Sequence, residues 1–302
     1  TPTAIDRSSV SGECMKSARD LIDSLRAYQP PNTDLGQHFL VDDQLLNVMV
    51  ELAEVSSNDH VLEIGPGPGT LTQVLLETGA KVTAIELDDG PVLHLDNVFS
   101  AQQNDGALSL LHGDALVQEW PKSITKIVSN IPYQISSPLI EKITKFNALN
   151  ETSLQSVILM VQQEFAQRLT MVHPSDVGSL GMTVALDWDV EEHHIVAPHS
   201  FSPQPAVHSQ VVSLHPHRTI WPTDKRLIRM MIHHAFAERR KKIRSTLRRA
   251  PRRISRLKGW HAQRWKDSIS SLLDHELMEL RPESLQLNDW IELAVGVEKG
   301  SN

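Results

Sequence analysis

The stretch His60–Thr70, HVLEIGPGPGT, decides the fold of this chain. It predicts a short apolar strand that runs into a glycine-rich turn, with a helix beginning at about Thr70. Gly65, Gly67 and Gly69 allow the backbone to turn sharply and to approach a ligand closely, because they carry no Cβ atom. The turn would also present free N–H groups and the positive end of a helix to that ligand.

A second strand, KVTAIEL, follows and contains Glu86, about 20 residues after Gly65. An acid at this spacing binds ribose hydroxyls in nucleotide-binding βαβ units. A phosphate-binding P-loop is excluded, since Thr70 and Leu71 follow Gly69 where that loop needs a lysine and a serine or threonine. The dinucleotide fingerprint GxGxxG also differs from this GxGxG turn. An ordinary glycine-rich turn between a strand and a helix is the alternative.

Composition and length favour a soluble protein with one large domain and one smaller domain. The chain has 302 residues, of which 40% are hydrophobic and 22% are charged. No apolar run approaches the ~20 residues that span a bilayer, and the N-terminus carries no apolar secretory segment. Cys14 is the only cysteine, which excludes an internal disulfide and favours a reducing compartment. We therefore expect a cytoplasmic protein without a membrane partner.

The net charge of −8 conceals a strong asymmetry. The segment from Lys225 to Lys266 holds 16 of the 29 basic residues and a single acid, Glu238. Such a basic segment on an acidic chain predicts a face that binds a polyanion, although a solvated pair of basic helices is the alternative. The candidate phosphate-binding residues are Arg239, Arg240, Lys241, Lys242, Arg244, Arg248 and Arg249.

The tetrapeptide Asn130-Ile131-Pro132-Tyr133 follows a predicted fourth strand, KIVS. The Asn130 side-chain oxygen and the next backbone carbonyl, that of Ile131, can both accept hydrogen bonds from an exocyclic amine. Pro132 stiffens the turn, and Tyr133 offers a flat face on which a base can stack. An amine held in this way keeps its lone pair available to attack an electrophile in line. A strand-ending Asn-x-Pro turn without chemistry is the alternative.

Two further candidates lie near predicted strand ends. A third strand, Ala107–Leu111, precedes Asp114, at the edge where open α/β sheets bind ligands; Asp114 could instead cap the next turn. The segments Met182–Val190 and Val207–Leu214 predict a final antiparallel pair that flanks Phe201. The proline-rich loop after Phe201 could aim its ring at a target base, or Phe201 could pack beneath the loop.

The histidines predict no metal site. His193-His194 and His233-His234 are adjacent pairs that lack the i, i+4 spacing of a zinc helix and have no partner cysteines.

Taken in order, LGQHFL, EIGPGPGT, IELD, GDAL, NIPYQISSPL and FSPQPAVHS resemble the ribosomal small-subunit RNA adenine N6,N6-dimethyltransferase family, also called the kasugamycin-resistance methyltransferase family. GPGPGT resembles the first motif of class I S-adenosylmethionine-dependent methyltransferases. NIPY resembles their (N/D/S)-(P/I/L)-P-(Y/F/W) motif for planar amines. The GQHFL form and RRKKIRSTLR are similar to archaeal-type members.

The resemblance implies an α/β fold: a Rossmann-like class I methyltransferase domain with a smaller all-helical RNA-binding domain. The expected divisions are an N-terminal extension at 1–31, the methyltransferase domain at 32–218 and the helical domain at 219–302. The residues that match the family's S-adenosylmethionine site are His38, Leu40, Gly65, Gly67, Glu86, Asp114, Ala115 and Asn130. Asn130, Ile131, Pro132, Tyr133 and Phe201 would surround the acceptor base.

The resemblance also implies the reaction. The enzyme would dimethylate two adjacent adenosines in a 3′-terminal hairpin loop of small-subunit rRNA, within the immature ribosomal subunit, as a monomer without a metal. The alternatives are methylation of another planar amine, such as a DNA adenine or a protein amide, and a non-catalytic RNA-binding assembly or transcription factor on the same fold.

Overall fold

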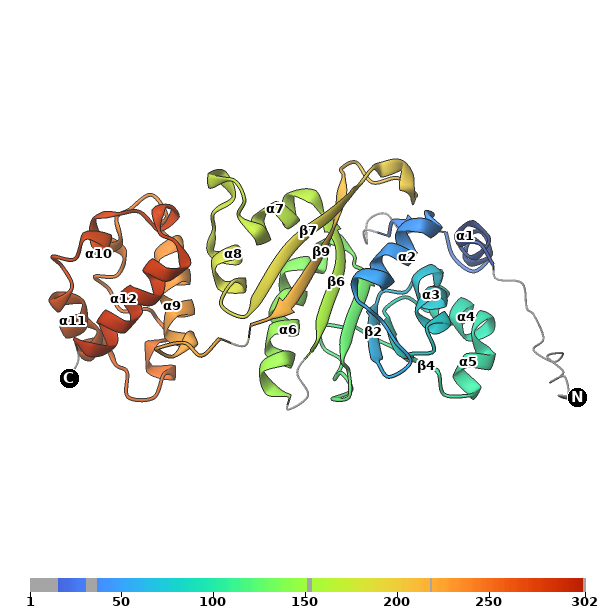
Figure 1. The fold of residues 1–302 in the computed structure, drawn as a ribbon, viewed down its shortest axis with the longest axis horizontal. Coiled ribbons are helices and arrows are strands. Elements are labelled where there is room, and N and C mark those ends of the chain that lie inside the picture. The colour runs from blue at the N-terminus through green and yellow to red at the C-terminus, as the bar shows by residue number, and fades with distance from the viewer. Residues whose placement is uncertain (1–15, 31–36, 151–153, 218, 301–302) are drawn as a thin grey trace, which may run out of the picture.

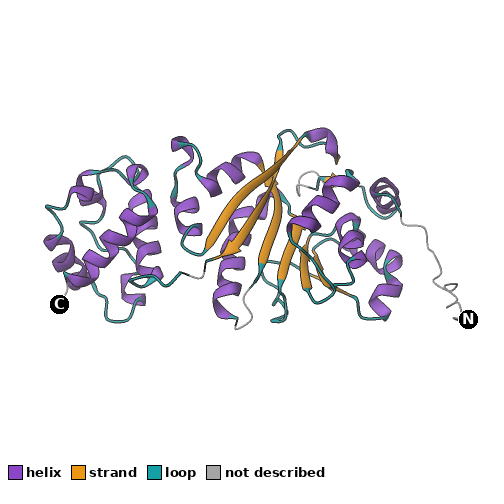
Figure 2. Cartoon of the chain, in the orientation of Figure 1, coloured by secondary structure: helices purple, strands orange, loops and turns teal. Residues whose placement is uncertain are grey.

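The protein consists of a sheet with helices on both faces and a helical unit beside it, in a computed structural model that describes residues 16–30, 37–150, 154–217 and 219–300 (Figures 1 and 2). The sheet has seven strands. In spatial order they are β4 (Leu108–His112), β3 (Lys81–Glu86), β2 (His60–Ile64), β5 (Lys126–Asn130), β6 (Ser156–Gln162), β9 (Ser209–Pro216) and β7 (Trp188–Val196). A separate two-stranded sheet pairs β1 (Phe39–Leu40) with β8 (Phe201–Ser202).

The directions of the strands indicate at which edge of the sheet a ligand should bind. Strands β4, β3, β2, β5 and β6 are parallel, whereas β9 runs antiparallel to both β6 and β7. The chain moves outward from β2 through β3 to β4 on one side and continues from β5 to β6 on the other. The order therefore reverses between β2 and β5, and in open α/β sheets ligands bind at the carboxyl ends of strands beside such a point.

Two apolar cores cover the two faces of the sheet. The helices of this part are α1 (Ala18–Arg26), α2 (Asp43–Leu52), α3 (Thr70–Glu77), α4 (Asp89–Val98), α5 (Ser100–Asn104), α6 (Ser136–Leu149), α7 (Gln163–Thr170) and α8 (Ser179–Val184). Residues of α2, α3 and α4, such as Met49 and Leu75, form one core, and residues of α6 and α7, such as Ile143 and Phe165, form the other. Short 3-10 turns lie at Tyr133–Ile135, Pro174–Asp176 and Pro198–Ser200.

The C-terminal unit is helical, as the family resemblance implies. It contains α9 (Lys225–Phe236), α10 (Ile243–Thr246), α11 (Ala262–Ser271) and α12 (Leu287–Lys299), with 3-10 turns at Ile254–Arg256, Glu276–Glu279 and Pro282–Ser284. Its core also contains Met182 and Leu186, which precede the predicted boundary at 218/219. The two expected domains thus share packing, and that boundary stays a prediction because residue 218 lies outside the described residues.

The predicted antiparallel pair that flanks Phe201 is present as β7 and β9, but the prediction that its first strand spans Met182–Val190 is wrong. Residues 179–184 form α8, and the strand of this region is β7, which begins at Trp188. Met182 and Leu186 lie four residues apart, so a helical turn brings both into the core of the C-terminal unit. β7 itself is an edge strand with mostly polar, partly exposed side chains, so its sequence, WDVEEHHIV, lacks a continuous apolar signal.

Within the described residues, no helix is long and apolar enough to cross a membrane. Most of the predicted N-terminal extension, residues 1–15 and 31, lies outside them, but α1 belongs to it.

Candidate active site

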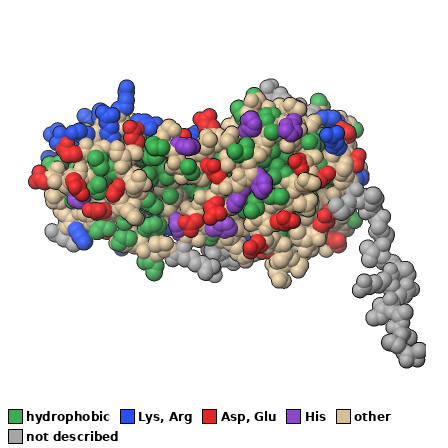
Figure 3. Space-filling view, turned by 45° about the horizontal axis from the view of Figure 1, so that its top comes forward, with side chains coloured by type: hydrophobic (Ala, Val, Ile, Leu, Met, Phe, Trp, Pro, Cys, Tyr) green, Lys and Arg blue, Asp and Glu red, His purple; other side chains and the backbone are tan. Residues whose placement is uncertain are grey.

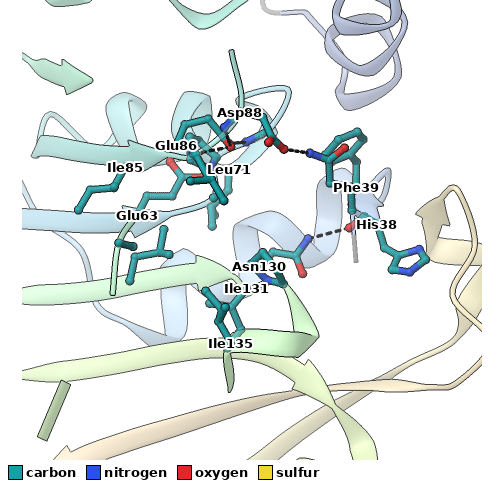
Figure 4. A pocket seen from close by; sticks show the side chains of 18 of the residues that line it. His38, Phe39, Glu63, Leu71, Ile85, Glu86, Asp88, Asn130, Ile131 and Ile135 are labelled. Atoms are coloured by element: carbon teal, nitrogen blue, oxygen red, sulfur yellow. Dashed lines mark hydrogen bonds between the residues drawn. The ribbon is translucent and has the colours of Figure 1, made fainter. Parts of the chain in front are cut away.

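A cavity opens at the carboxyl ends of β2 and β5, where the strand order reverses (Figure 4). It holds about 1170 Å³ of empty space, part of which is open to solvent. The residues expected to bind the cofactor all line it: His38, Leu40, Gly65, Gly67, Glu86, Asp114, Ala115 and Asn130. Ile131, Pro132 and Tyr133 line the same cavity, so the two main sequence motifs meet there.

The glycine turn follows β2 and forms one wall. Gly67 has φ +53°, in the left-handed region that favours glycine. A Cβ atom added to Gly67 would lie 2.7 Å from Cε1 of Phe39, so the ring of Phe39 rests directly on the turn. An added Cβ at Gly65 would lie 3.4 Å from Cδ of Pro132, which shows how closely the glycine turn approaches the tetrapeptide.

Glu86, at the end of β3, is buried at the cavity wall. Its Oε2 accepts a hydrogen bond from the Gly67 N–H at 3.0 Å, and its Oε1 accepts from Leu87 N at 2.8 Å and Asp88 N at 3.1 Å. Burial raises the pKa of Glu86, while the hydrogen bonds from Asp88 and Gly67 oppose that rise. The carboxylate thus fixes the glycine turn and keeps further lone pairs to accept from ligand hydroxyls.

Glu63 is a buried acid in the cavity wall to which the sequence analysis assigned no role. Only 2% of it is exposed, and its Oε2 accepts a hydrogen bond from the Thr72 hydroxyl at 2.6 Å. Burial raises the pKa of Glu63 to about 8, the Thr72 bond opposes that rise, and the nearby charge of Glu86 adds to it. The one sequence signal was an acid inside an otherwise apolar strand, two residues before Gly65.

We expect Glu63→Gln to change how stability depends on pH. Because the folded-state pKa lies above the unfolded value near 4.5, stability from this residue is complete below the unfolded pKa and is lost as pH rises towards 8. Relative to the glutamine variant, the wild type should lose about 1.4 kcal/mol of unfolding free energy per pH unit between pH 5 and 8. Urea titrations of both proteins across this range test it; parallel curves would contradict it.

Asp114 follows β4 at the rim of the cavity. Its Oδ1 accepts a hydrogen bond from Leu116 N at 2.8 Å, which is the turn-capping role considered as the alternative. The carboxylate is also exposed and lines the cavity. Capping by Oδ1 leaves the other carboxylate oxygen, Oδ2, available to accept a hydrogen bond from a cofactor amine. That contact stays a prediction.

Asn130, the last residue of β5, is oriented by the segment before α2. Its Nδ2 donates a hydrogen bond to the His38 carbonyl at 3.1 Å, as Figure 4 shows. This bond requires the amide nitrogen to face His38, so Oδ1 is the atom left to accept from an acceptor amine. The sequence predicted Asn130 but gave no sign of its partner, which lies 92 positions away.

Tyr133 contacts two other elements. Its hydroxyl lies 2.6 Å from the Ser209 Oγ, and its ring is stacked with the His38 ring at a centroid distance of 5.6 Å and an interplanar angle of 25°. The His38 Nδ1 lies 2.9 Å from the Pro203 carbonyl oxygen. His38 therefore joins Asn130, Tyr133 and the 201–205 loop. The sequence marked His38 only as a cofactor contact, so this joining role was missed.

The Phe201 side chain is not presented to the cavity. It is 2% exposed and lies in the core cluster that contains Leu40 and Val211. Pairing of β1 with β8, in which Leu40 lies opposite Phe201, directs the ring inward. This is the alternative considered from the sequence, packing beneath the loop, so this conformation does not support the predicted contact between Phe201 and a base.

The basic segment forms a second hollow in the C-terminal unit, with about 3270 Å³ of empty space including open solvent. Figure 3 shows lysine and arginine side chains gathered at the upper left, over this unit. Some of the predicted phosphate contacts have acidic partners: Arg239 pairs with Glu283 at 3.0 Å, Lys241 with Glu238 at 2.9 Å, and Lys242 and Arg244 with Glu279 at 2.7 and 2.5 Å.

Another group of arginines has no ion pair with any residue that the structure describes. Arg248, Arg249, Arg252 and Arg253 belong to it; all four are exposed, and all four line the hollow. Arg252 and Arg253 were not among the residues predicted from the sequence. In the described part of the chain, no three His, Cys, Asp or Glu side chains are grouped as metal ligands.

Comparison with known proteins gives one consistent family. The family described as "Ribosomal RNA adenine dimethylase" matches residues 29–258. "Probable ribosomal RNA small subunit methyltransferase A" of Methanospirillum hungatei is 34% identical over 273 residues, which cover 89% of this chain and 98% of the relative. A protein of the same name from Methanopyrus kandleri is 42% identical over 187 residues, or 62% of this chain and 64% of the relative.

Solved structures show the same fold. A dimethyladenosine transferase from Plasmodium falciparum superposes with a TM-score of 0.73 at 26% identity, covering 87% of this chain and 98% of that one. The 23S rRNA methyltransferase ErmE gives a TM-score of 0.59 at 22% identity, covering 86% of this chain and 99% of that one. The second likeness, at that identity, concerns the fold alone.

Proposed function

The chain belongs to the ribosomal RNA adenine dimethylase family. We propose that it dimethylates N6 of two adjacent adenosines in a 3′-terminal hairpin loop of small-subunit rRNA. It is an S-adenosylmethionine-dependent rRNA adenine dimethyltransferase with a Rossmann-like fold. The names of the relatives support the small subunit as the target, and a role in its assembly follows from that target. Cytoplasmic location and a monomeric state remain predictions.

The residues present fit S-adenosylmethionine. The Gly67 N–H donates to the buried Glu86 carboxylate, which fixes the glycine turn at the cavity wall, and this carboxylate suits ribose hydroxyls. Asp114 at the rim provides an acceptor for the adenine amine, and Leu40 and Ala115 add apolar contacts. When bound, this cofactor supplies an electrophilic methyl group on a sulfonium.

The orientation of Asn130 is the observation that carries the proposal. With Nδ2 held by the His38 carbonyl, Oδ1 would accept one hydrogen of the adenine N6 amine in the first transfer and the Ile131 carbonyl the other, while the N6-methyl amine of the second transfer has one hydrogen for these two acceptors. Pro132 packs closely against Gly65, so an amine held by this tetrapeptide would lie beside the glycine turn. Tyr133 provides a stacking face for the base, and rate acceleration comes mainly from alignment of the amine with the methyl group.

We expect Glu86→Ala to weaken S-adenosylmethionine binding by roughly 1–3 kcal/mol, the cost of losing hydrogen bonds to a charged group. The substitution also removes the hydrogen bond from the Gly67 N–H to Glu86, which holds the glycine turn in place. Calorimetry on folded protein measures it. Affinity equal to that of the wild type would remove Glu86 from the cofactor site.

The reaction is tested with methyl-labelled cofactor and small ribosomal subunits that lack the modification. Label should enter two adjacent adenosines, and it should enter far more slowly with Asn130→Ala, which controls for contaminating methyltransferases. Mature subunits, duplex DNA containing adenine and a protein amide serve as competing substrates. Label in DNA or protein but not in rRNA would identify one of the other planar amines as the substrate.

A further inference from the structure

Helix α1 lies outside the part of the chain that matches the family, which begins at residue 29. Its sequence is built to form a stable helix. Ser17 accepts a hydrogen bond from Asp20 N, and the Asp20 carboxylate accepts from Ser17 N in return, which completes a capping box. Ala18, Leu21, Ile22 and Leu25 are buried on one face of this helix, while Arg19, at the edge of that face, is exposed and lines a hollow with Ile22 and Arg26.

The buried face of α1 packs on the residue that covers the cofactor turn. Ile22 and Leu25, each 2% exposed, form an apolar cluster with Phe39, and Val41 packs against it. The Phe39 ring in turn lies against Gly67, where a Cβ would be 2.7 Å away. One continuous line of contacts therefore runs from α1 through Phe39 to the glycine turn.

The residues after α1 reach the other side of the same turn. The Tyr28 ring meets the His94 ring edge-on at 5.6 Å, and Asn97 Nδ2 donates to the Tyr28 hydroxyl at 3.0 Å. His94 is fully buried, and its Nε2 bonds to the Pro68 carbonyl at 3.1 Å, within the turn. The Gln29 side-chain oxygen accepts from Gly90 N at the start of α4.

A third contact joins α1 to the acceptor side. Arg26 donates to the Ser202 Oγ at 2.7 Å, next to Pro203, whose carbonyl bonds to His38. Figure 1 shows α1 beside α2 and α4, at the end of the molecule away from the C-terminal unit. None of these contacts uses a residue expected to touch RNA phosphates.

We propose that α1 is a brace that retains the cofactor: Ile22 and Leu25 hold Phe39 on the glycine turn, and cofactor exchange requires this packing to loosen. The proposal rests on the proposed function only for the identity of the cofactor. Dimethylation of two adenosines uses four methyl groups, so the spent cofactor must leave after each transfer. The strength of the packing between α1 and Phe39 thus sets how fast the site exchanges spent cofactor for S-adenosylmethionine.

The test is the dissociation rate of S-adenosylhomocysteine, measured by stopped-flow displacement without RNA. The double variant Ile22→Ala/Leu25→Ala should release it about tenfold faster, which corresponds to about 1.4 kcal/mol. Arg19→Ala, which removes an exposed side chain of the same helix outside the apolar cluster with Phe39, should release it at the wild-type rate. The KM for S-adenosylmethionine should rise in parallel, and the KM for RNA should stay unchanged.

A cycle with Phe39→Leu separates bracing from a general loss of stability. If α1 acts through Phe39, the effects of Leu25→Ala and Phe39→Leu on the dissociation rate should not be additive. If the two residues acted independently, the effects on the free energy of activation would be additive. Wild-type dissociation from a folded Ile22→Ala/Leu25→Ala protein, or additive effects in the cycle, would overturn the brace. Because this assay contains no RNA, failure to methylate rRNA would contradict the proposed function and leave the brace standing.

Discussion

Asn130→Ala should lower the rate of methyl transfer by about 10²-fold or more while RNA affinity stays close to that of the wild type. In the proposed arrangement the side chain contacts a single amine, so its removal should cost little binding but misalign the reacting nitrogen. Single-turnover measurements with saturating cofactor and RNA isolate this step from product release. A near-normal single-turnover rate would show that another group orients the amine.

Asn130→Asp is the matched control for this prediction. The carboxylate can still accept a hydrogen bond from the amine but cannot donate one to the His38 carbonyl. The variant therefore distinguishes the role of Oδ1 as an acceptor from the role of the His38 hydrogen bond in orienting the side chain. We expect a rate between those of the wild type and Asn130→Ala. A rate as low as that of the alanine variant would assign the main effect to the hydrogen bond with His38.

The strand, glycine turn and helix that form one wall of the cavity were predicted well, because each is specified by residues close together in the sequence. The strand that begins at His60, the turn through Gly67 and the helix that begins at Thr70 are each specified by residues within the element itself. The strand that carries Glu86 likewise has its own apolar pattern. With parallel strands placed side by side, the ends of β2, β3 and β5 had to meet at one edge.

Features that depend on distant partners could not be predicted. Phe201 faces the core because β8 pairs with β1, a contact between segments about 160 residues apart. The neutral state expected of Glu63 depends on complete burial, which an apolar strand with one acid does not reveal. Residues 182–184 end a helix and residues 185–187 form a turn because Met182 and Leu186 pack in the core of the second unit, and this tertiary contact overrode the strand-like composition.

The basic segment illustrates the same limit for charge. Its composition predicted a polyanion-binding face, but it could not show which cations are neutralised within the protein. Glu279 and Glu283 follow about 40 positions later and pair with Lys242, Arg244 and Arg239. Arginines without such partners keep their full charge for an external anion, whereas a cation already paired must first break its bond.

Arg248→Glu/Arg249→Glu should therefore weaken binding to small-subunit rRNA by roughly 10- to 100-fold, while cofactor affinity stays unchanged. Each phosphate contact releases counterions, so the loss of two contacts should flatten the log–log dependence of affinity on salt by about 1.4 to 1.8. The matched control is Lys225→Glu/Arg226→Glu, which changes net charge equally but alters cations paired with Asp187 and Asp224. Its loss of affinity should be smaller, with a nearly unchanged slope. Equal losses in both double variants would show that the overall field of the C-terminal unit, rather than contacts from the unpaired arginines, holds the RNA.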